Sequence, residues 1–391
     1  MSQKIIKTGI IGFGLSGRVF HAPSLHTNPN FTLYKVVERH REDSKKIYPY
    51  LAVVKDWHEL LTDPAIDLVV VATPNILHYP MVKECIQAGK HVVVEKPFTV
   101  STAQADELIK LAESCDRKIF VYHNRRWDGD FLTVKKVLKS NILGNLTTYE
   151  AHFDRYRPDL IPGAWREEDQ RGSGILYDLG SHLIHQALHL FGIPFKIRAI
   201  ITSKRKGNKV DDCFDLIFTY QGLKLPAKSC GESPTAKENV DFIRSLTPPQ
   251  ATGNALAVQF KAILKADMLV KEEGPRFMIE GERGSFAKYG TDPQEEALKK
   301  GIMPDRNGWG KESPEIRGTI IYAYKGLNIE GKIETEAGRY QEFYNNVSAV
   351  LAKGHEMAVK PIEARNVIRM IELAFESSKT RSEITVSDMG Q

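Results

Sequence analysis

Three features are scarce in this chain of 391 residues, and each absence excludes a class of protein. No apolar run approaches the ~18 residues that a membrane span needs, and the first residues hold no apolar core of a signal peptide. Cysteine occurs only at positions 85, 115, 213 and 230, without a C-x-x-C pair, which is typical of a reducing compartment. The net charge of +5 is small and scattered, and it indicates no polyanionic partner. We therefore expect a cytoplasmic protein that binds neither membranes nor nucleic acid.

The length and the composition instead indicate a globular protein with more than one core. Hydrophobic residues make up 42% of the chain and charged residues 26%, as in ordinary globular proteins. A length of 391 residues exceeds the ~250–300 residues that one core supports. We expect two domains, the first over residues 1–122 and the second over residues 123–391.

Strand and helix patterns alternate along the first domain, which predicts a doubly wound α/β fold of the Rossmann type. The runs LVVVAT and HVVVEK are nearly all apolar, as are parallel strands that are covered on both faces. Pro23 should make the first helix short or irregular, and Ser101 with Gln104 predicts a capping box at the start of the last one. The expected strands are 6–11, 32–37, 68–73, 91–95 and 119–122, and the expected helices lie near 17–27, 42–47, 57–62, 78–89 and 101–116.

In the second domain, strands follow one another without long helices between them, which predicts an α+β fold with a mostly antiparallel open sheet. Helices should cover one face of this sheet, and the other face could join the subunits of a homodimer or homotetramer. Closing helices near 339–353 and 361–378 should pack back on the first domain. The other expected elements are helices at 130–140 and 175–191, strands near 146–154, 196–203, 213–220 and after 262, a hairpin at 281–290, one short helix within 292–313, and an insertion at 229–261 with a short helix near 236–246.

A glycine-rich turn joins the first strand to the first helix. Residues 12–17, Gly12-Phe13-Gly14-Leu15-Ser16-Gly17, have the pattern G-x-G-x-x-G. Gly12 would permit a tight turn, Gly14 would let the backbone approach a pyrophosphate, and Gly17 would let the helix pack closely on the strand. An ordinary glycine-rich turn is the alternative, but the position between a strand and a helix favours a dinucleotide site.

Charged residues at the end of the second strand bear on the choice of dinucleotide. Glu38 lies 21 residues after Gly17, where an acid can accept hydrogen bonds from ribose hydroxyls and so favours NAD. Arg39 follows at once and could instead pair with the 2′-phosphate of NADP. A solvated charged turn is the third interpretation. These residues leave the choice between NAD and NADP open.

The third and fourth strands end in polar residues at the edge of the sheet where ligands bind in open α/β folds. Thr73-Pro74-Asn75 ends the third strand, and Glu95-Lys96-Pro97 follows the fourth. A lysine at this edge could polarise a carbonyl or exchange a proton with a hydroxyl, although an isolated lysine is more often a surface residue. The bond before Pro97 is a candidate for the cis form.

Asp178 and His182 lie four residues apart in the expected helix 175–191 and should share one of its faces. Histidine has an ordinary pKa of ~6.5, which suits a proton acceptor, and Asp178 could orient its imidazole. Gly180 inside a helix suggests that another group approaches closely there. Solvated or core histidines are the alternative. No metal site is expected, because Asp178, His182 and His189 would extend over more than ~16 Å along one helix.

Four stretches together resemble the Gfo/Idh/MocA family of oxidoreductases: GFGLSG at 12–17, ATPN at 72–75, GKHVVVEKPF at 89–98 and YDLGSHLIHQALHLFG at 177–192. Two further stretches, YHNRRWDGDFLTVKK at 122–136 and DRYRP at 154–158, resemble its NADP-dependent scyllo-inositol 2-dehydrogenase-like members. The resemblance implies a dehydrogenase or reductase that uses NAD(P)(H) to interconvert an alcohol and a ketone of a cyclic polyol or sugar, such as an inositol and its inosose. A sugar dehydrogenase of the same family and a non-catalytic dinucleotide-binding sensor are the alternatives.

The resemblance also implies roles for individual residues. Lys96, Asp178 and His182 would be catalytic and would converge on the substrate beside the nicotinamide. The expected cofactor contacts are Gly12, Phe13, Gly14, Leu15, Ser16, Gly17, Glu38, Arg39, Thr73, Pro74, Asn75, His78, Glu95 and Lys96. Polar and aromatic groups suit a polyhydroxylated ligand, and on that ground the expected substrate contacts are Asn124, Arg125, Trp127, Arg155, Tyr156 and Trp165. For any single arginine, a salt bridge between the domains is an equally good interpretation.

Overall fold

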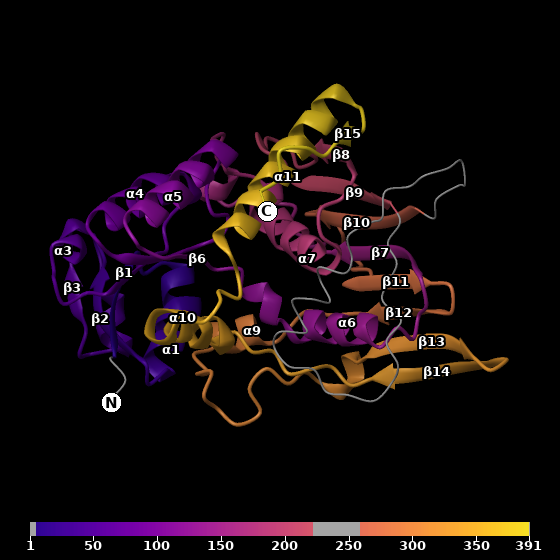
Figure 1. Ribbon diagram of the computed structural model, residues 1–391, viewed down its shortest axis with the longest axis horizontal. Helices are drawn as coiled ribbons and strands as arrows, with labels where there is room; N and C mark the ends of the chain where they lie inside the picture. Colours follow the sequence, from indigo (N-terminus) through magenta and orange to yellow (C-terminus); the bar gives the residue numbers. More distant parts are fainter. Residues whose placement is uncertain (1–4, 222–258, 391) are drawn as a thin grey trace.

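The computed structural model describes residues 5–221 and 259–390, which form two β-sheets with helices between and around them (Figure 1). The labels η1 to η6 denote short 3-10 or π-helical segments. The predicted insertion at 229–261, with its short helix, lies almost entirely outside the described residues. Among the described helices, none is both long enough and apolar enough to cross a lipid bilayer.

The first sheet is parallel throughout, and the glycine-rich turn follows its first strand. Its strand order is β3-β2-β1-β4-β5-β6, which is the order of doubly wound dinucleotide-binding folds. The predicted Rossmann fold is therefore confirmed. Its strands are β1 (Ile6–Ile11), β2 (Phe31–Val37), β3 (Ala52–Val54), β4 (Leu68–Val71), β5 (His91–Val94) and β6 (Ile119–Val121).

Both faces of the first sheet are buried, because alternate residues of its apolar strands enter two different cores. Val69 and Val71 pack in a cluster with residues of α4 and α5, whereas Val70 and Val93 pack on the other side with residues of α1 and α10. The helical segments of this part are η1 (Gly17–His21), α1 (Ala22–Thr27), α2 (Asp43–Ile47), α3 (His58–Leu61), η2 (Asn75–Leu77), α4 (His78–Gln87) and α5 (Thr102–Ser114).

The second sheet has nine strands in the order β14-β13-β12-β11-β7-β10-β9-β8-β15. Only the β7–β10 pair is parallel among its described neighbours, which confirms the mostly antiparallel sheet. Its strands are β7 (Leu146–His152), β8 (Lys196–Thr202), β9 (Cys213–Gln221), β10 (Gln259–Asp267), β11 (Phe277–Gly281), β12 (Gly284–Lys288), β13 (Gly318–Tyr324), β14 (Leu327–Ile333) and β15 (Ile384–Thr385).

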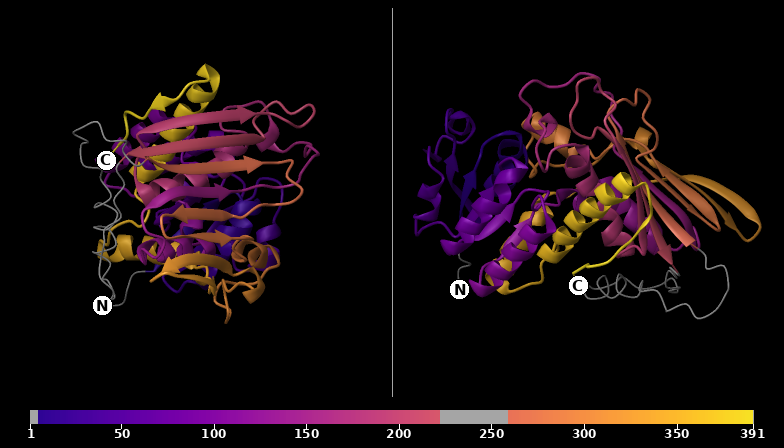
Figure 2. Two further views of the ribbon diagram at one scale, coloured as in Figure 1. Left: turned by 90° about the vertical axis from the view of Figure 1, so that its right-hand side faces the viewer. Right: turned by 90° about the horizontal axis from the view of Figure 1, so that it is seen from above.

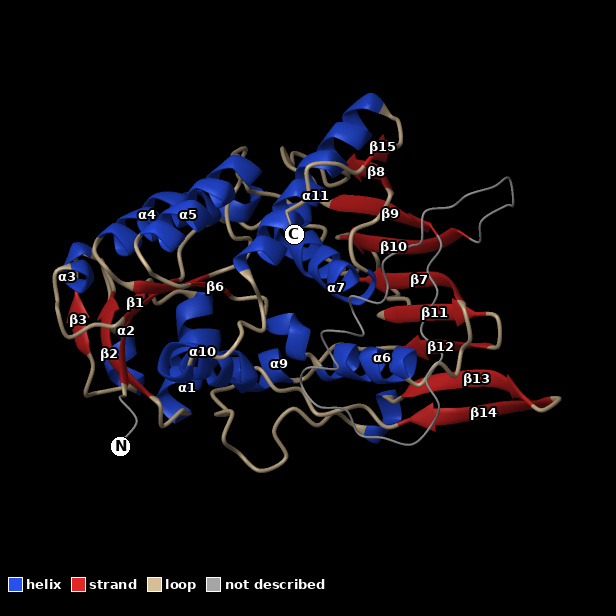
Figure 3. Ribbon diagram, viewed as in Figure 1, coloured by secondary structure: helices blue, strands red, loops and turns tan. Residues whose placement is uncertain are grey.

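Helices lie on one face of the second sheet, and its other face carries no helix formed by the described residues (Figures 2 and 3). The remaining helical segments are η3 (Asn124–Trp127), α6 (Gly129–Lys139), η4 (Trp165–Glu167), η5 (Leu176–Gly180), α7 (Ser181–Phe191), α9 (Gln294–Lys299), η6 (Pro314–Ile316), α10 (Gln341–Lys353) and α11 (Pro361–Thr380).

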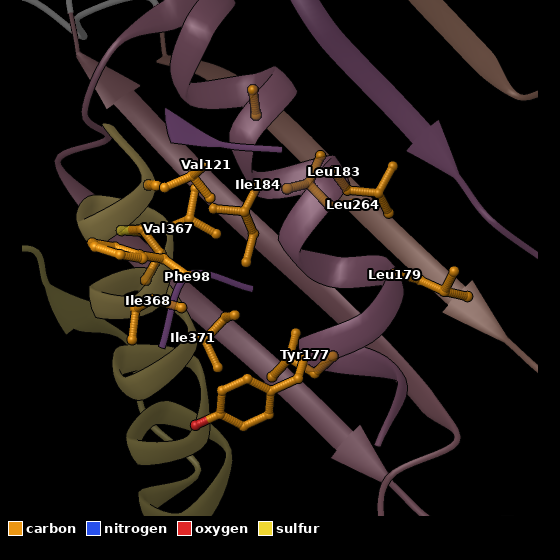
Figure 4. Packing of buried hydrophobic residues seen from close by; sticks show 14 of the residues in the cluster. Phe98, Val121, Tyr177, Leu179, Leu183, Ile184, Leu264, Val367, Ile368 and Ile371 are labelled. Atoms are coloured by element: carbon orange, nitrogen blue, oxygen red, sulfur yellow. The ribbon is translucent and has the colours of Figure 1, made fainter. Parts of the chain in front are cut away.

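The two sheets are joined by a continuous apolar core in which α7 and α11 lie side by side (Figure 4). Ile184 of α7 points toward Val367 of α11, Leu183 lies beside Leu264 of β10, and Phe98, which follows β5, lies near Ile368 in the same cluster. The helix α11 also contacts α5 and β8, and α10 contacts α1. The C-terminal helices thereby fix the edge of the first sheet against the second.

The local differences from the predicted elements have simple causes. The helix expected over 17–27 begins as the π-turn η1, and Pro23, which has no N–H to donate, follows within the first turn of α1. The short strand β3 was not predicted, since its three residues carry no pattern. Ser101 accepts a hydrogen bond from the Gln104 N–H, but the Gln104 side-chain oxygen has no partner among the described residues, so only half of the predicted capping box forms. A Cβ on Gly180 would lie 2.7 Å from the end of the Leu176 side chain and 3.3 Å from the Phe214 ring, which agrees with the close approach predicted there.

Candidate active site

A cavity of about 680 Å³ opens where the carboxyl ends of the first sheet's strands face the second sheet. Residues from both parts of the chain line it, which include Ser16, Thr73 and Lys96 on one wall and Asp178 and His182 on the other. We call these the first wall and the second wall. Ligands of doubly wound folds bind at this edge of the sheet.

The glycine-rich turn leaves open space at one end of the first wall. Gly12 has φ +95°, and a Cβ there would lie 2.6 Å from the Ala72 carbonyl oxygen. A Cβ on Gly17 would collide with the Gly12 carbonyl oxygen. A Cβ on Gly14, in contrast, would meet no atom within 4 Å. The two outer glycines are therefore required by the turn itself, and the space at Gly14 fits the close approach of a pyrophosphate.

A buried network ties this turn to the lysine of the next motif. The Ser16 hydroxyl donates to Glu95 Oε1, and Nε2 of His21 lies 3.1 Å from the same oxygen. Glu95 Oε2 accepts from the Lys96 N–H at 3.0 Å, and His21 Nδ1 lies 2.7 Å from the Tyr344 hydroxyl. Burial alone would raise the pKa of Glu95, but His21, Lys96 and Ser16 lower it to about 2. Glu95 therefore holds the turn and the lysine in place rather than offering a free carboxylate to a cofactor.

The loops after β4 and β5 are linked by His78, which the sequence placed among the cofactor contacts. Its ring nitrogens lie 2.8 Å from the Pro97 carbonyl oxygen and 3.0 Å from the Thr73 carbonyl oxygen, and its side chain is fully buried. His78 thus joins two loops and does not reach the cavity, where Pro74 is also absent from the lining. Thr73 does line it, and its buried hydroxyl has no partner among the described residues. That free hydroxyl fits a group that a bound cofactor would complete.

Glu38 has a role that its position in the sequence did not indicate. Its two carboxylate oxygens accept hydrogen bonds from the Ser44 and Asp43 N–H groups at 2.8 and 2.9 Å, so it caps the start of α2. The ribose contact expected of Glu38 stays a prediction, and both of its oxygens already accept hydrogen bonds from the chain. The neighbouring Arg39 is exposed, and its side chain has no ion pair or hydrogen bond with any described residue. This arrangement suits a phosphate better than a neutral ribose hydroxyl.

Lys96 reaches from the first wall to the second. Its Nζ donates to Asp178 Oδ1 at 2.7 Å and to the Asp178 carbonyl oxygen at 2.9 Å, and the Lys96–Pro97 bond is cis. The Arg166 Nε lies 3.6 Å from the same carboxylate oxygen. Burial opposes ionisation of Asp178, but the charges of Lys96 and Arg166 lower its pKa well below the ordinary value.

His182 lines the cavity beside this pair, but Asp178 does not orient it. The Nδ1 atom of His182 is buried and has no hydrogen-bond partner among the described residues. The expected orientation of His182 by Asp178 is therefore not found. The Asp178 carboxylate is instead paired with Lys96 and lies beside Arg166. Burial, followed by the charges of Lys96 and Arg125, lowers the pKa of His182 well below 6.5.

Most of the predicted substrate contacts lie along the cavity. Arg155 lines it without a fixed ion pair to any described residue, and Arg125 lines it while paired with Asp128 and Glu295. Trp127 does not line the cavity, because its ring packs against Phe343 at 6.0 Å. The other predicted contacts, all of which line the cavity, are Asn124, Tyr156 and Trp165.

Several residues of the site were not predicted, and few of them carry a signal in the sequence. His21 and Tyr344 act through a network that joins distant segments, so no local pattern indicates them. Asp211 lines the second wall and accepts from the Leu176 N–H at 2.7 Å. Glu295, in the predicted short helix, pairs with Arg125 at 2.6 Å. Within the described residues, no group of three or more His, Cys, Asp or Glu side chains is placed to hold a metal ion.

The parallel sheet, the glycine-rich turn and the cavity with Lys96 and His182 define an NAD(P)-binding oxidoreductase. Residues 6–123 match the oxidoreductase family with an NAD-binding Rossmann fold. Residues 131–238 match the GFO/IDH/MocA C-terminal domain, and residues 251–386 match the C-terminal alpha/beta domain of the oxidoreductase family.

Individual relatives agree with these matches. The chain is 37% identical over 379 residues to the scyllo-inositol 2-dehydrogenase (NADP(+)) IolW of Bacillus subtilis strain 168, which covers 97% of this chain and 95% of that protein. It is 36% identical to the uncharacterized oxidoreductase YdgJ of Escherichia coli K12, over 98% of this chain and 99% of that protein. The solved structure of yvaA from Bacillus subtilis superposes with a TM-score of 0.86 at 36% identity and covers 99% of this chain and 100% of that one.

The chain therefore belongs to the Gfo/Idh/MocA family of NAD(P)-dependent oxidoreductases, as its motifs predicted.

Proposed function

We propose that the protein interconverts a secondary alcohol and a ketone of a cyclic polyol or sugar, with Lys96, Asp178 and His182 as its catalytic residues. The observation that carries this proposal is that Lys96 and His182 line one cavity together with Leu15 and Ser16 of the glycine-rich turn. Arginine and aromatic side chains line the rest of the second wall, which suits a ligand with many hydroxyls. The relative IolW is named as a scyllo-inositol 2-dehydrogenase, which supports an inositol-like substrate.

The proposed roles of His182, Lys96 and Asp178 differ with their charges. When bound, a nicotinamide dinucleotide exchanges hydride with the carbon that carries the reacting hydroxyl. His182 is neutral near pH 7 because its pKa is lowered, and its ring can accept the hydroxyl proton. Lys96 places a positive charge beside the oxygen as the proton leaves and stabilises the negative charge that develops there. Asp178 holds the lysine at 2.7 Å and so fixes its position.

NADP is the better candidate for the cofactor. Glu38 is occupied by the N-terminus of α2 and cannot readily turn to a ribose, while Arg39 is exposed and unpaired among the described residues. An exposed arginine at this place can pair with a 2′-phosphate. IolW is named as an NADP(+) enzyme, which agrees with this reading.

The assembly and the domain division also form part of the proposal. The face of the second sheet that carries no described helix has exposed apolar side chains, which include Ile200 and Ile321. A second copy of the chain would cover such a face, so a homodimer or homotetramer is proposed. We place the boundary between the cofactor domain and the substrate domain near residue 122.

A panel of polyols and sugars, assayed at 340 nm with NAD and with NADP, tests the proposed reaction. It should include myo-inositol, scyllo-inositol and glucose, and the inososes for the reverse direction. We expect reduction of NADP with at least one cyclic polyol. Turnover of aldoses alone would favour a sugar dehydrogenase. Tight cofactor binding without any absorbance change in either direction would favour a sensor and contradict the proposal.

A further inference from the structure

The nearest unexplained polar group behind His182 is a second histidine. His123 follows β6 and is only 1% exposed. Its ring centre lies 6.5 Å from that of His182, and the two ring planes meet at 84°. Both nitrogens of His123 and the Nδ1 of His182 are buried and have no hydrogen-bond partner among the described residues. Three imidazole nitrogens are thus left unsatisfied at one place.

Such a cluster is costly unless a small polar molecule fills it. A buried donor or acceptor without a partner costs about 1–3 kcal/mol, and buried waters commonly satisfy such groups. A separation of 6.5 Å between ring centres is too long for a direct bond between the rings, which needs about 3 Å between the heavy atoms. One bridging water, about 3 Å from a nitrogen of each ring, would span this separation. A neutral imidazole has one donor and one acceptor nitrogen, so the two rings offer a water both kinds of partner.

His123 is itself held in a fixed orientation. Its ring is stacked on that of His185, with 4.0 Å between the centres and 6° between the planes. The Arg126 Nε donates to His185 Nε2 at 3.1 Å, so His185 must carry its own proton on Nδ1. Burial, followed by the charges of Arg126 and Lys96, lowers the pKa of His123 to about 3. His123 therefore stays neutral and offers a water one donor and one acceptor.

We propose that His123 is the positioning residue of His182 and acts through one buried water. The water accepts the Nδ1–H of His182 and donates to a nitrogen of His123, which leaves Nε2 of His182 unprotonated for the hydroxyl proton. When that proton arrives, Nδ1 keeps its bond to the water, and the ring later returns the proton from Nε2 to solvent. This is the orienting role that the sequence assigned to Asp178, which the structure pairs with Lys96 instead.

The role of His182 as a proton acceptor rests on the proposed function. The tautomer of His182 does not, because it is a property of the chain alone. It can therefore be tested without cofactor or substrate. In protein labelled with ¹⁵N-histidine, the two ring-nitrogen shifts of His182, assigned by their loss in His182→Gln, report which nitrogen carries the proton. We expect Nδ1–H and a bare Nε2 in the unmodified protein. An Nε2–H tautomer there would overturn the proposal, whatever the variants do.

Two variants and a control sharpen the test. His123→Phe keeps a flat ring against His185 and removes both nitrogens, so the Nδ1–H form of His182 should lose its preference. His123→Gln restores a polar group and should recover it in part. With an active substrate, kcat should fall roughly 10–100-fold in His123→Phe while KM and cofactor affinity hold, a loss like that of orienting partners elsewhere. His58→Phe, at an exposed histidine, is the control. An unchanged tautomer and kcat in a folded His123→Phe would overturn the proposal; failure of the substrate panel alone would not.

Discussion

The two walls of the cavity satisfy their buried polar groups in different ways. On the first wall, both carboxylate oxygens of Glu95 accept hydrogen bonds from the chain. On the second wall, the His182 Nδ1, the Arg125 Nε and one oxygen of Asp154 are buried without partners among the described residues. The hydroxyls of Thr73 and Tyr122 are exceptions on the first wall. The carboxylate of the first wall is thus satisfied before a ligand arrives, while the second wall leaves charged and imidazole groups for a substrate or for water.

The same difference between the walls appears in the pKa values of two carboxyl groups, Glu95 and Asp211. Glu95 on the first wall is surrounded by donors and cations, and its pKa is lowered to about 2. Asp211 on the second wall is bonded mainly to backbone N–H groups, and burial raises its pKa to about 6. A wall whose carboxylate is already hydrogen-bonded suits the cofactor, which binds in the same way in every turnover. A wall whose polar groups lack hydrogen-bond partners suits the substrate, which exchanges a proton in every turnover.

The largest effect should come from Lys96, whose side chain joins the two walls. In Lys96→Met the charge beside the reacting oxygen is lost, and kcat should fall about 10²–10⁴-fold with little change in cofactor affinity. Steady-state kinetics and NADPH fluorescence titration measure the two quantities. Lys83→Met, at an exposed lysine of α4, is the control. Equal losses of kcat and of cofactor affinity would mean that Lys96 serves the cofactor instead.

The next largest effect is expected for Glu95→Ala, which tests whether Glu95 holds the first wall together. In Glu95→Ala, His21 and Ser16 lose a fully buried partner, and the free energy of unfolding should fall by about 3–5 kcal/mol. Chemical denaturation measures it. Glu107→Ala, which removes an exposed partner of Lys83, should leave the denaturation midpoint unchanged. A Glu95→Ala protein as stable as the parent would show that the network is not what holds the turn.

A smaller, pH-dependent effect is expected at Asp211. Because its folded pKa is raised to about 6 from the ordinary 3.8, the protonated form stabilises the folded state at low pH, and that contribution is lost as the pH rises through 6. Asp211→Asn keeps an acceptor for the Leu176 N–H but cannot ionise. Its Tm relative to the parent should therefore be higher at pH 8 than at pH 4.5. Asp215→Asn on β9 is the matched control, and a pH-independent difference at Asp211 would refute the assignment.

The smallest effect concerns the choice of dinucleotide at the edge of the first wall. Arg39→Ser should raise KM for NADP about 10-fold, the equivalent of ~1.4 kcal/mol, and leave KM for NAD unchanged. Lys46→Ser removes a nearby exposed charge on α2 and serves as the control. If KM changes equally for NAD and NADP in Arg39→Ser, Arg39 does not bind the 2′-phosphate.

Features of the fold and of the site that depend on residues close together in the chain could be predicted from the sequence. The order of the first sheet and the position of the glycine turn follow from local patterns, namely apolar runs and three spaced glycines, and the structure has both. The sequence also singled out Lys96, Asp178 and His182, and the structure brings all three to one cavity. Motifs of this kind depend on residues that are close in the chain.

The differences arose where a contact joins distant segments. Asp178 was expected to orient His182, but it pairs with Lys96, which lies 82 residues earlier in the chain. Trp127 turned into the core because Phe343, more than 200 residues away, offers it an aromatic neighbour. None of these outcomes has a local signature.

In the proposed reaction, the first wall holds the cofactor while His182 on the second wall takes the proton. NADPH affinity and turnover, measured in the same His182→Ala protein, separate these two roles. We expect an NADPH dissociation constant within about twofold of the parent and turnover lower by about 10²–10⁴-fold with the best substrate. Turnover close to that of the parent, with the cofactor still bound, would contradict the proposed role of His182.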